Sequence, residues 1–177
     1  MKPRIISRLT FLHRSILGGI GFLPFSSLLS AQQSKEKQLA LKLELVKEFI
    51  GVCHSNIDKV KELLMNEPQL LHSSFDWGGG DFESGIEAAG HVGNKEIAAF
   101  LLANGARYNI YLACMLGHID VVKLVVASNP KLLNSKGPHG FTMLHHANKG
   151  GEGSKAVAEF LVSVGAKETK LDFYAKG

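Results

Sequence analysis

The stretch GHIDVVKLVV at residues 117–126 has a counterpart 62 residues earlier, SNIDKVKELL at residues 55–64. The two copies continue in register, as PKLLNS at residues 130–135 and PQLLHS at residues 68–73. A third copy, GNKEIAAFLL at residues 93–102, lies midway between them. Self-similarity with a period of about 31 residues predicts a stack of repeats rather than one globular core.

The apolar residues of these copies have the spacing of an amphipathic helix. Ile97, Phe100 and Leu101 recur at the i, i+3, i+4 positions that share one helix face. Gly93 and Gly117 stand where a tight turn between two helices needs positive φ, which glycine adopts without a Cβ penalty. With a fourth copy ending in VAEFLV at residues 157–162, the pattern predicts an all-α solenoid of about four helix-turn-helix repeats.

The motifs resemble those of the ankyrin repeat. GFTMLHHA at residues 140–147 matches the β-turn finger and the T-P-L-H-x-A opening of a first helix, with Met143 in place of the family's proline. The resemblance implies a scaffold that binds other proteins through its fingers and first helices. It also implies structural roles, at inter-helix turns, helix ends and helix openings, for Gly93, Gly105, Gly117, His118, Thr142, His145 and Gly165.

Two spacings depart from the family's pattern of about 33 residues. Gly93 and Gly117 are only 24 residues apart, so we expect the third repeat to lack its finger. The interval from Ser55 to Gly93 is longer than the pattern and predicts one enlarged loop around Trp77, beside a gap. We place the repeat domain at residues 39–168, with repeats at about 39–72, 82–106, 107–134 and 138–166, and a C-terminal tail at 169–177.

The N-terminus has the features of an export signal. Four basic residues precede a short apolar run at residues 15–29, and SAQ at residues 30–32 fits a cleavage site near Ala31. SRLTFLH at residues 7–13 resembles a twin-arginine signal, but Leu9 replaces the second arginine, so general secretion stays open as the route. We therefore predict a bacterial-type export signal at residues 1–31, a linker at 32–38 and a periplasmic or extracellular protein. A membrane-tethered scaffold with an uncleaved signal is the alternative.

The net charge argues against a nucleic-acid partner. The whole chain carries 20 basic and 16 acidic residues, a formal net charge of +4. Lys2, Arg4, Arg8 and Arg14 all lie before residue 32, where there is no acidic residue. Without that segment the charges balance, so the basic character belongs to the signal.

The two cysteines, Cys53 and Cys114, fall at equivalent positions of the first and third repeats. Repeats stack on the order of 10 Å apart, so the two Cα atoms should be about 20 Å apart, whereas a disulfide needs about 7 Å or less. We predict two free, buried thiols.

Known catalytic and metal-binding patterns are missing from the sequence. His145 and His146 are adjacent, and consecutive helical side chains point about 100° apart. No H-x-x-E-H or paired Cys/His spacing of a zinc site is present, and no G-x-S-x-G elbow. We therefore predict a non-enzymatic protein without a metal or cofactor.

The enlarged loop is the strongest candidate for a functional surface. It combines three glycines with aromatic and acidic residues, and we expect its aromatic rings to pack on the repeats or contact a partner, with its carboxylates solvated. An enzyme or metal-binding protein using residues 76–83 is the alternative. The hypothesis is a monomeric protein-protein interaction module of the cell envelope, whose partner contacts are Trp77, Asp81, Phe82, Glu83, His91, Tyr111, His139 and Phe141.

Overall fold

The computed structural model describes residues 40–174. The predicted signal peptide at residues 1–31, the linker at 32–38 and residues 175–177 of the tail lie outside this range. Within the described range, no helix combines the length and the apolar character needed to cross a membrane.

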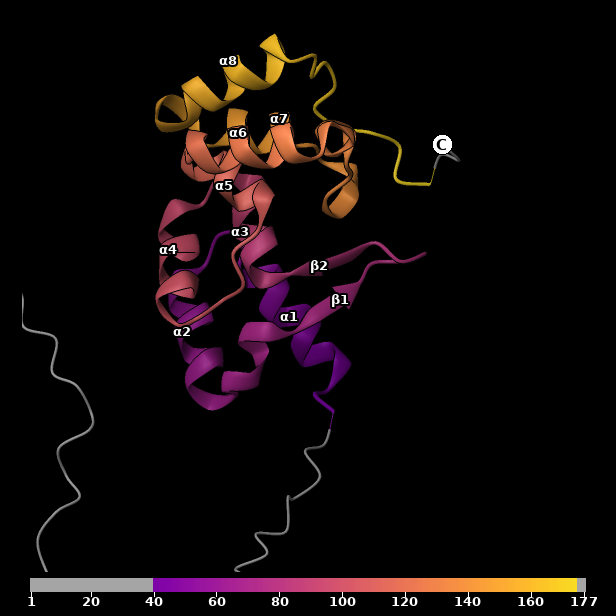
Figure 1. The fold of residues 1–177 in the computed structure, drawn as a ribbon. Helices are drawn as coiled ribbons and strands as arrows, with labels where there is room; N and C mark the ends of the chain where they lie inside the picture. The colour runs from indigo at the N-terminus through magenta and orange to yellow at the C-terminus, as the bar shows by residue number, and fades with distance from the viewer. Residues whose placement is uncertain (1–39, 175–177) are drawn as a thin grey trace, which may run out of the picture. The chain divides into compact units, whose positions relative to one another are not determined.

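Eight α-helices form four antiparallel pairs in the described residues (Figure 1). The first helices of the pairs stack on one another as an inner layer, and the second helices form an outer layer. The inner helices are α1 (Leu43–Val52), α3 (Gly85–Val92), α5 (Ile110–Leu116) and α7 (Met143–Lys149); the outer helices are α2 (Ile57–Asn66), α4 (Lys95–Ala103), α6 (Ile119–Ser128) and α8 (Lys155–Ser163). The predicted all-α repeat solenoid is confirmed.

Short polar side chains and glycines define the helix ends. Asn94 and Asn109 accept hydrogen bonds at the N-termini of α4 and α5 from the backbone N–H groups of Ile97 and Leu112. Gly117 ends α5 with φ of 80°, a left-handed conformation that lets the chain reverse into α6. Three-residue to five-residue 3₁₀ segments complete the connections: η1 (Pro68–His72), η2 (Pro130–Asn134), η3 (Pro138–Gly140) and η4 (Gly151–Ser154).

The enlarged loop is a β-hairpin. Strand β1 (Ser74–Asp76) pairs antiparallel with β2 (Phe82–Ser84), and Ser74 lies opposite Ser84. Asp76 closes the turn, since its Oδ1 accepts hydrogen bonds from the N–H groups of Gly78 (2.8 Å) and Gly80 (3.1 Å). The hairpin packs on α1 through β1 and on α3 through β2.

The third repeat has no finger. Helix α4 ends at Ala103 and α5 begins at Ile110, with no strand or 3₁₀ segment between them. This deletion leaves a cleft of about 440 Å³ between the hairpin and residues 107–109, the gap that the spacing predicts. It also allows α7 to contact α3 directly, in addition to α5, which brings the last finger at residues 137–141 against the hairpin.

The core is apolar and includes both thiols. Phe49, Ile97 and Leu161 are fully buried between the layers. Cys53 and Cys114 are free and buried, as predicted. Burial raises the pKa of each thiol to about 12, so both stay protonated and pack as small hydrophobic groups.

The C-terminal tail extends across the last finger. Lys170 forms an isolated antiparallel bridge with Phe141, and the N–H of Leu171 donates to the carbonyl of Gly140 over 2.9 Å. The hydroxyl of Tyr174 then donates to the carbonyl of Gly78 in the hairpin turn. The tail therefore joins the last finger to the hairpin.

Candidate functional site

Four segments bring polar side chains together beneath the hairpin. Strand β2 contributes Glu83, α3 contributes His91, and the residues after α1 contribute His54. The last finger contributes His139 from the opposite side. Strand β2 alternates in the usual way, so Phe82 points outward and Glu83 points inward.

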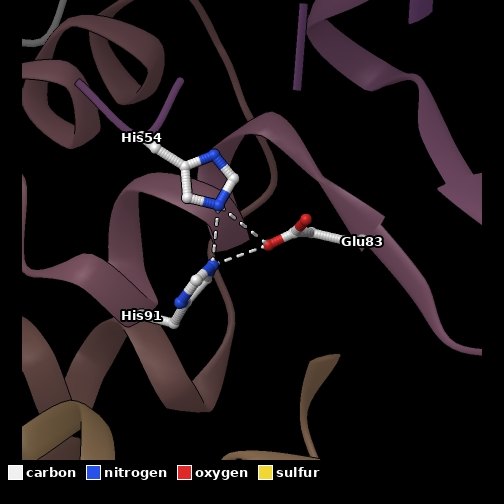
Figure 2. Close-up of side chains that lie close together, drawn as sticks. All are labelled: His54, Glu83 and His91. Carbon is white, nitrogen blue, oxygen red and sulfur yellow. Dashed lines mark hydrogen bonds and ion pairs between the residues drawn. The ribbon is translucent and has the colours of Figure 1, made fainter. Parts of the chain in front are cut away.

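The Glu83 carboxylate is the centre of this cluster and is fully buried. Its Oε1 lies 2.8 Å from Nε2 of His91 and 3.8 Å from Nε2 of His54 (Figure 2). Its Oε2 accepts a hydrogen bond of 2.8 Å from the indole N–H of Trp77 and lies 3.4 Å from Nε2 of His139. Burial acts to raise the pKa of the Glu83 carboxyl, but contact with His91, and then with His139 and His54, outweighs it and holds the pKa below its usual value.

Two histidines of the cluster contact each other through their Nε2 atoms. Nδ1 of His54 lies 3.1 Å from the carbonyl oxygen of Ile50 and can only donate to it, which makes Nε2 the acceptor in the neutral ring of His54. In that state, the N–H at Nε2 of His91 donates to Nε2 of His54 over 3.0 Å. Oε1 of Glu83 is left without an aligned hydrogen bond in spite of its closeness to His91.

Asp81 fixes the last finger to the hairpin. One carboxylate oxygen accepts from the backbone N–H of His139 and the other contacts Nδ1 of the same residue, each over 2.8 Å. His139 has a φ of 59°, which is unfavourable for a residue with a Cβ. The double contact with Asp81 stabilises this conformation.

Aromatic stacking continues the cluster toward the last repeat. The Phe141 ring stacks on His145 with centroids 3.9 Å apart and on His91 at 5.2 Å. Nε2 of His145 donates to the carbonyl of His91 over 2.9 Å, which joins α7 to α3. The Tyr111 ring lies beside that of His146, with centroids 5.1 Å apart, and the Tyr111 hydroxyl donates to the side chain of Ser135.

The predicted partner contacts divide into surface and buried residues. Phe82 is 58% exposed and Trp77 is 38% exposed, so both are available to a partner. Asp81, Glu83 and His91 are buried, and their assignment as direct contacts is corrected: they hold the surface residues from beneath. The expectation of solvated carboxylates is therefore wrong for Asp81 and Glu83, because histidines of three different segments surround them, and holds only for the exposed Asp76.

The residues assigned to the repeat framework occupy turns and helix ends. Gly93, Gly105, Gly117 and Gly165 all have positive φ. Thr142 caps α7, where its hydroxyl accepts from the N–H of His145, and the exposed His118 precedes α6 and contacts the Tyr108 hydroxyl.

His54 is the residue of the cluster that the sequence did not single out. It follows Cys53 in the chain, and consecutive residues at the end of a helix do not face each other, so the two do not form a catalytic dyad. The Cys53 thiol is buried, with the raised pKa given above, so it is no nucleophile at neutral pH. His54 faces the hairpin instead, and together with Glu83 and His91 it presents two imidazole nitrogens and a carboxylate oxygen that could hold a metal ion.

Paired helices stacked in two layers, with fingers projecting at one edge, define a helical repeat protein. A family model of three ankyrin repeats matches residues 85–172, and over these residues the chain belongs to the ankyrin-repeat family. Ankyrin repeats indicate a protein-protein interaction module, and the family is generally non-enzymatic. A comparison with curated proteins found no match.

Proposed function

We propose that this chain is an exported protein-interaction module that binds its partner with the β1–β2 hairpin and the adjoining cleft. The observation that carries this proposal is the exposed ring of Phe82 at the edge of the cleft. Aromatic side chains held at a concave surface are typical anchors of protein interfaces.

The surroundings of Phe82 support its role as a preorganised anchor. Both of its neighbours in the chain are buried and bonded, Asp81 to His139 and Glu83 to Trp77. The outward direction of the Phe82 side chain is therefore set before a partner arrives, which reduces the entropy lost on binding. The cleft adds apolar lining from Leu71 and a positive charge from Arg107.

The location of the interaction rests on the N-terminal sequence. A basic segment, an apolar run and a small-residue site near Ala31 favour export, and we place the partner in the cell envelope or outside the cell. The protein acts as a monomer in this proposal, since one chain supplies the whole surface.

Affinity capture with matched variants tests the proposal. Full-length protein is used to capture partners from a cell-envelope fraction, with Phe82→Ala as the test and Leu124→Ala as the control. Leu124 is a 69% exposed apolar residue on the outer helix α6. Its truncation therefore also removes an exposed apolar side chain, but at a place away from the hairpin. We expect a stoichiometric partner with the unmodified protein and Leu124→Ala, and at least about tenfold less of it with Phe82→Ala.

The opposite pattern contradicts the proposal. A partner lost with Leu124→Ala but kept with Phe82→Ala would place the interface on the outer helices. Phe82→Ala is preferred to Trp77→Ala because the Trp77 indole also bonds Glu83, so its removal would disturb the buried cluster.

A further inference from the structure

His54, Glu83 and His91 form a triangle of potential metal ligands beneath the hairpin (Figure 2). The sides of the triangle are 3.0 Å between the two Nε2 atoms, 2.8 Å from Oε1 to His91 and 3.8 Å from Oε1 to His54. A triangle with these sides has a circumscribed radius of about 1.9 Å. An ion slightly out of its plane would therefore lie about 2.0–2.2 Å from all three atoms, the bond lengths of zinc to nitrogen and oxygen.

From this geometry we propose that His54, Glu83 and His91 bind a divalent transition-metal ion of the zinc type. Two imidazoles and one carboxylate form a ligand set that zinc accepts in tetrahedral sites with one further position. Imidazole nitrogens favour such ions over magnesium or calcium, which prefer oxygen ligands.

The surroundings of Glu83 Oε1 are a second observation in favour of a cation, since its close contacts are the ion pairs with His91 and His54 and neither is an aligned hydrogen bond. Oε1 is inaccessible to solvent and has no aligned hydrogen bond. A buried carboxylate oxygen that lacks aligned donors is costly to keep out of water. A cation at the centre of the triangle would satisfy this oxygen.

The groups around the triangle already orient the ligands as metal sites require. The carbonyl of Ile50 accepts the Nδ1–H of His54, which leaves Nε2 of His54 free to coordinate. The indole N–H of Trp77 holds the second oxygen of Glu83, so Oε1 faces the histidines. Binding requires only that His91 exchange the proton on Nε2 for the ion, because both ring tautomers of a neutral histidine are accessible.

An entry path exists on the side of His54. Its side chain is 29% exposed, whereas that of His91 is 10% exposed and that of Glu83 is buried. Water can complete the coordination from the His54 side. This inference is independent of the proposed partner, since either can hold without the other.

Zinc titration of the metal-free full-length protein tests the proposal. The variants are His54→Ala, which removes the most exposed ligand, and Glu83→Gln, which keeps the acceptor for Trp77 but removes the charge. His72→Ala is the control, because His72 is exposed on η1 and is no part of the triangle. Calorimetry gives the stoichiometry and affinity, and circular dichroism confirms that each variant is folded.

We expect one zinc ion per chain in the unmodified protein and in His72→Ala, together with a rise in melting temperature. His54→Ala and Glu83→Gln should each weaken zinc affinity by at least about tenfold, because even the loss of a group that only hydrogen-bonds a metal ligand weakens binding by that much. If folded unmodified protein takes up no zinc at neutral pH, or if it binds zinc no more tightly than His54→Ala and Glu83→Gln do, the proposal is wrong and the cluster is an ion-pair network only.

Discussion

Glu83 shows how one buried charge organises its surroundings. A carboxylate taken out of water is costly unless opposite charges or donors surround it. Here a tryptophan N–H and three histidines from separate segments converge on it. Because removing any one of these partners leaves the charge less compensated, the cluster constrains the hairpin, α3 and the last finger together.

Asp81 should contribute measurably to stability through its contacts with His139. Asp81→Ala removes a buried acceptor from two partly buried donors of His139, and we expect a loss of about 2–3 kcal/mol in the free energy of unfolding, measured with urea. Asp76→Ala is the control in the same hairpin. Asp76 is exposed, so its loss should cost about 1 kcal/mol or less. Equal losses for the two variants would refute the anchoring role of Asp81.

His146 should make the fold sensitive to acid. Burial first of all, followed by the charges of His145 and His91, lowers its pKa from 6.5 to about 4, while its Nδ1–H donates to the carbonyl of Thr142. The neutral ring therefore favours the folded state above pH 6.5, and this contribution is lost as the pH falls from 6.5 toward 4. The difference amounts to about 3 kcal/mol.

His146→Phe should remove that part of the pH dependence, since phenylalanine does not titrate. The expected result is a free energy of unfolding that declines less steeply between neutral pH and pH 4 than in the unmodified protein, measured with urea at several pH values. Identical slopes would mean that His146 is protonated in the folded state.

At the scale of elements, local signals explain what sequence alone could predict. Turn glycines such as Gly117 and helix spacing recur within each repeat, so the helix pairs and the missing finger follow from nearby residues. The contacts of the buried cluster cannot be predicted in this way. His54 and Glu83 are 29 residues apart in the sequence, and His139 and Asp81 are 58 residues apart. The contact of His54 depends on how the hairpin packs beside α1, and that of His139 on the approach of α7 to α3 past the shortened third repeat; no local pattern encodes either.

The inter-helix turns should differ in their tolerance of a side chain. A Cβ on Gly117 would lie 2.0 Å from the backbone oxygen of Gly153, whereas a Cβ on Gly105 would meet nothing within 4 Å. Both have positive φ, so Gly105→Ala should cost about 1–2 kcal/mol from backbone strain alone. Gly117→Ala should cost at least about 1 kcal/mol more, because α5 must separate from the turn before α8. Denaturant unfolding of the two variants measures this difference, and equal costs would contradict the close packing at Gly117.

At the scale of the whole molecule, the stack departs from strict nearest-neighbour order. In a regular solenoid each repeat contacts only the adjacent ones. Here α3 contacts α7 as well as α5, and the tail residue Tyr174 reaches Gly78. One edge of the repeat domain therefore combines the hairpin, the last finger and the tail into a single surface.

Processing of the N-terminus is a prediction for the full-length protein. We expect N-terminal sequencing of protein recovered from the cell envelope to begin near Gln32, with the four basic residues of the signal removed. An intact Met1 on membrane-bound protein would instead favour the tethered scaffold.

Hydrogen exchange of the captured complex is the most direct test of the interaction surface. We expect the partner to slow exchange of the backbone amides at residues 74–84, 107–109 and 137–141, which form the hairpin, the cleft and the last finger. Protection confined to the outer helices α2, α4, α6 and α8, with the hairpin unchanged, would contradict it.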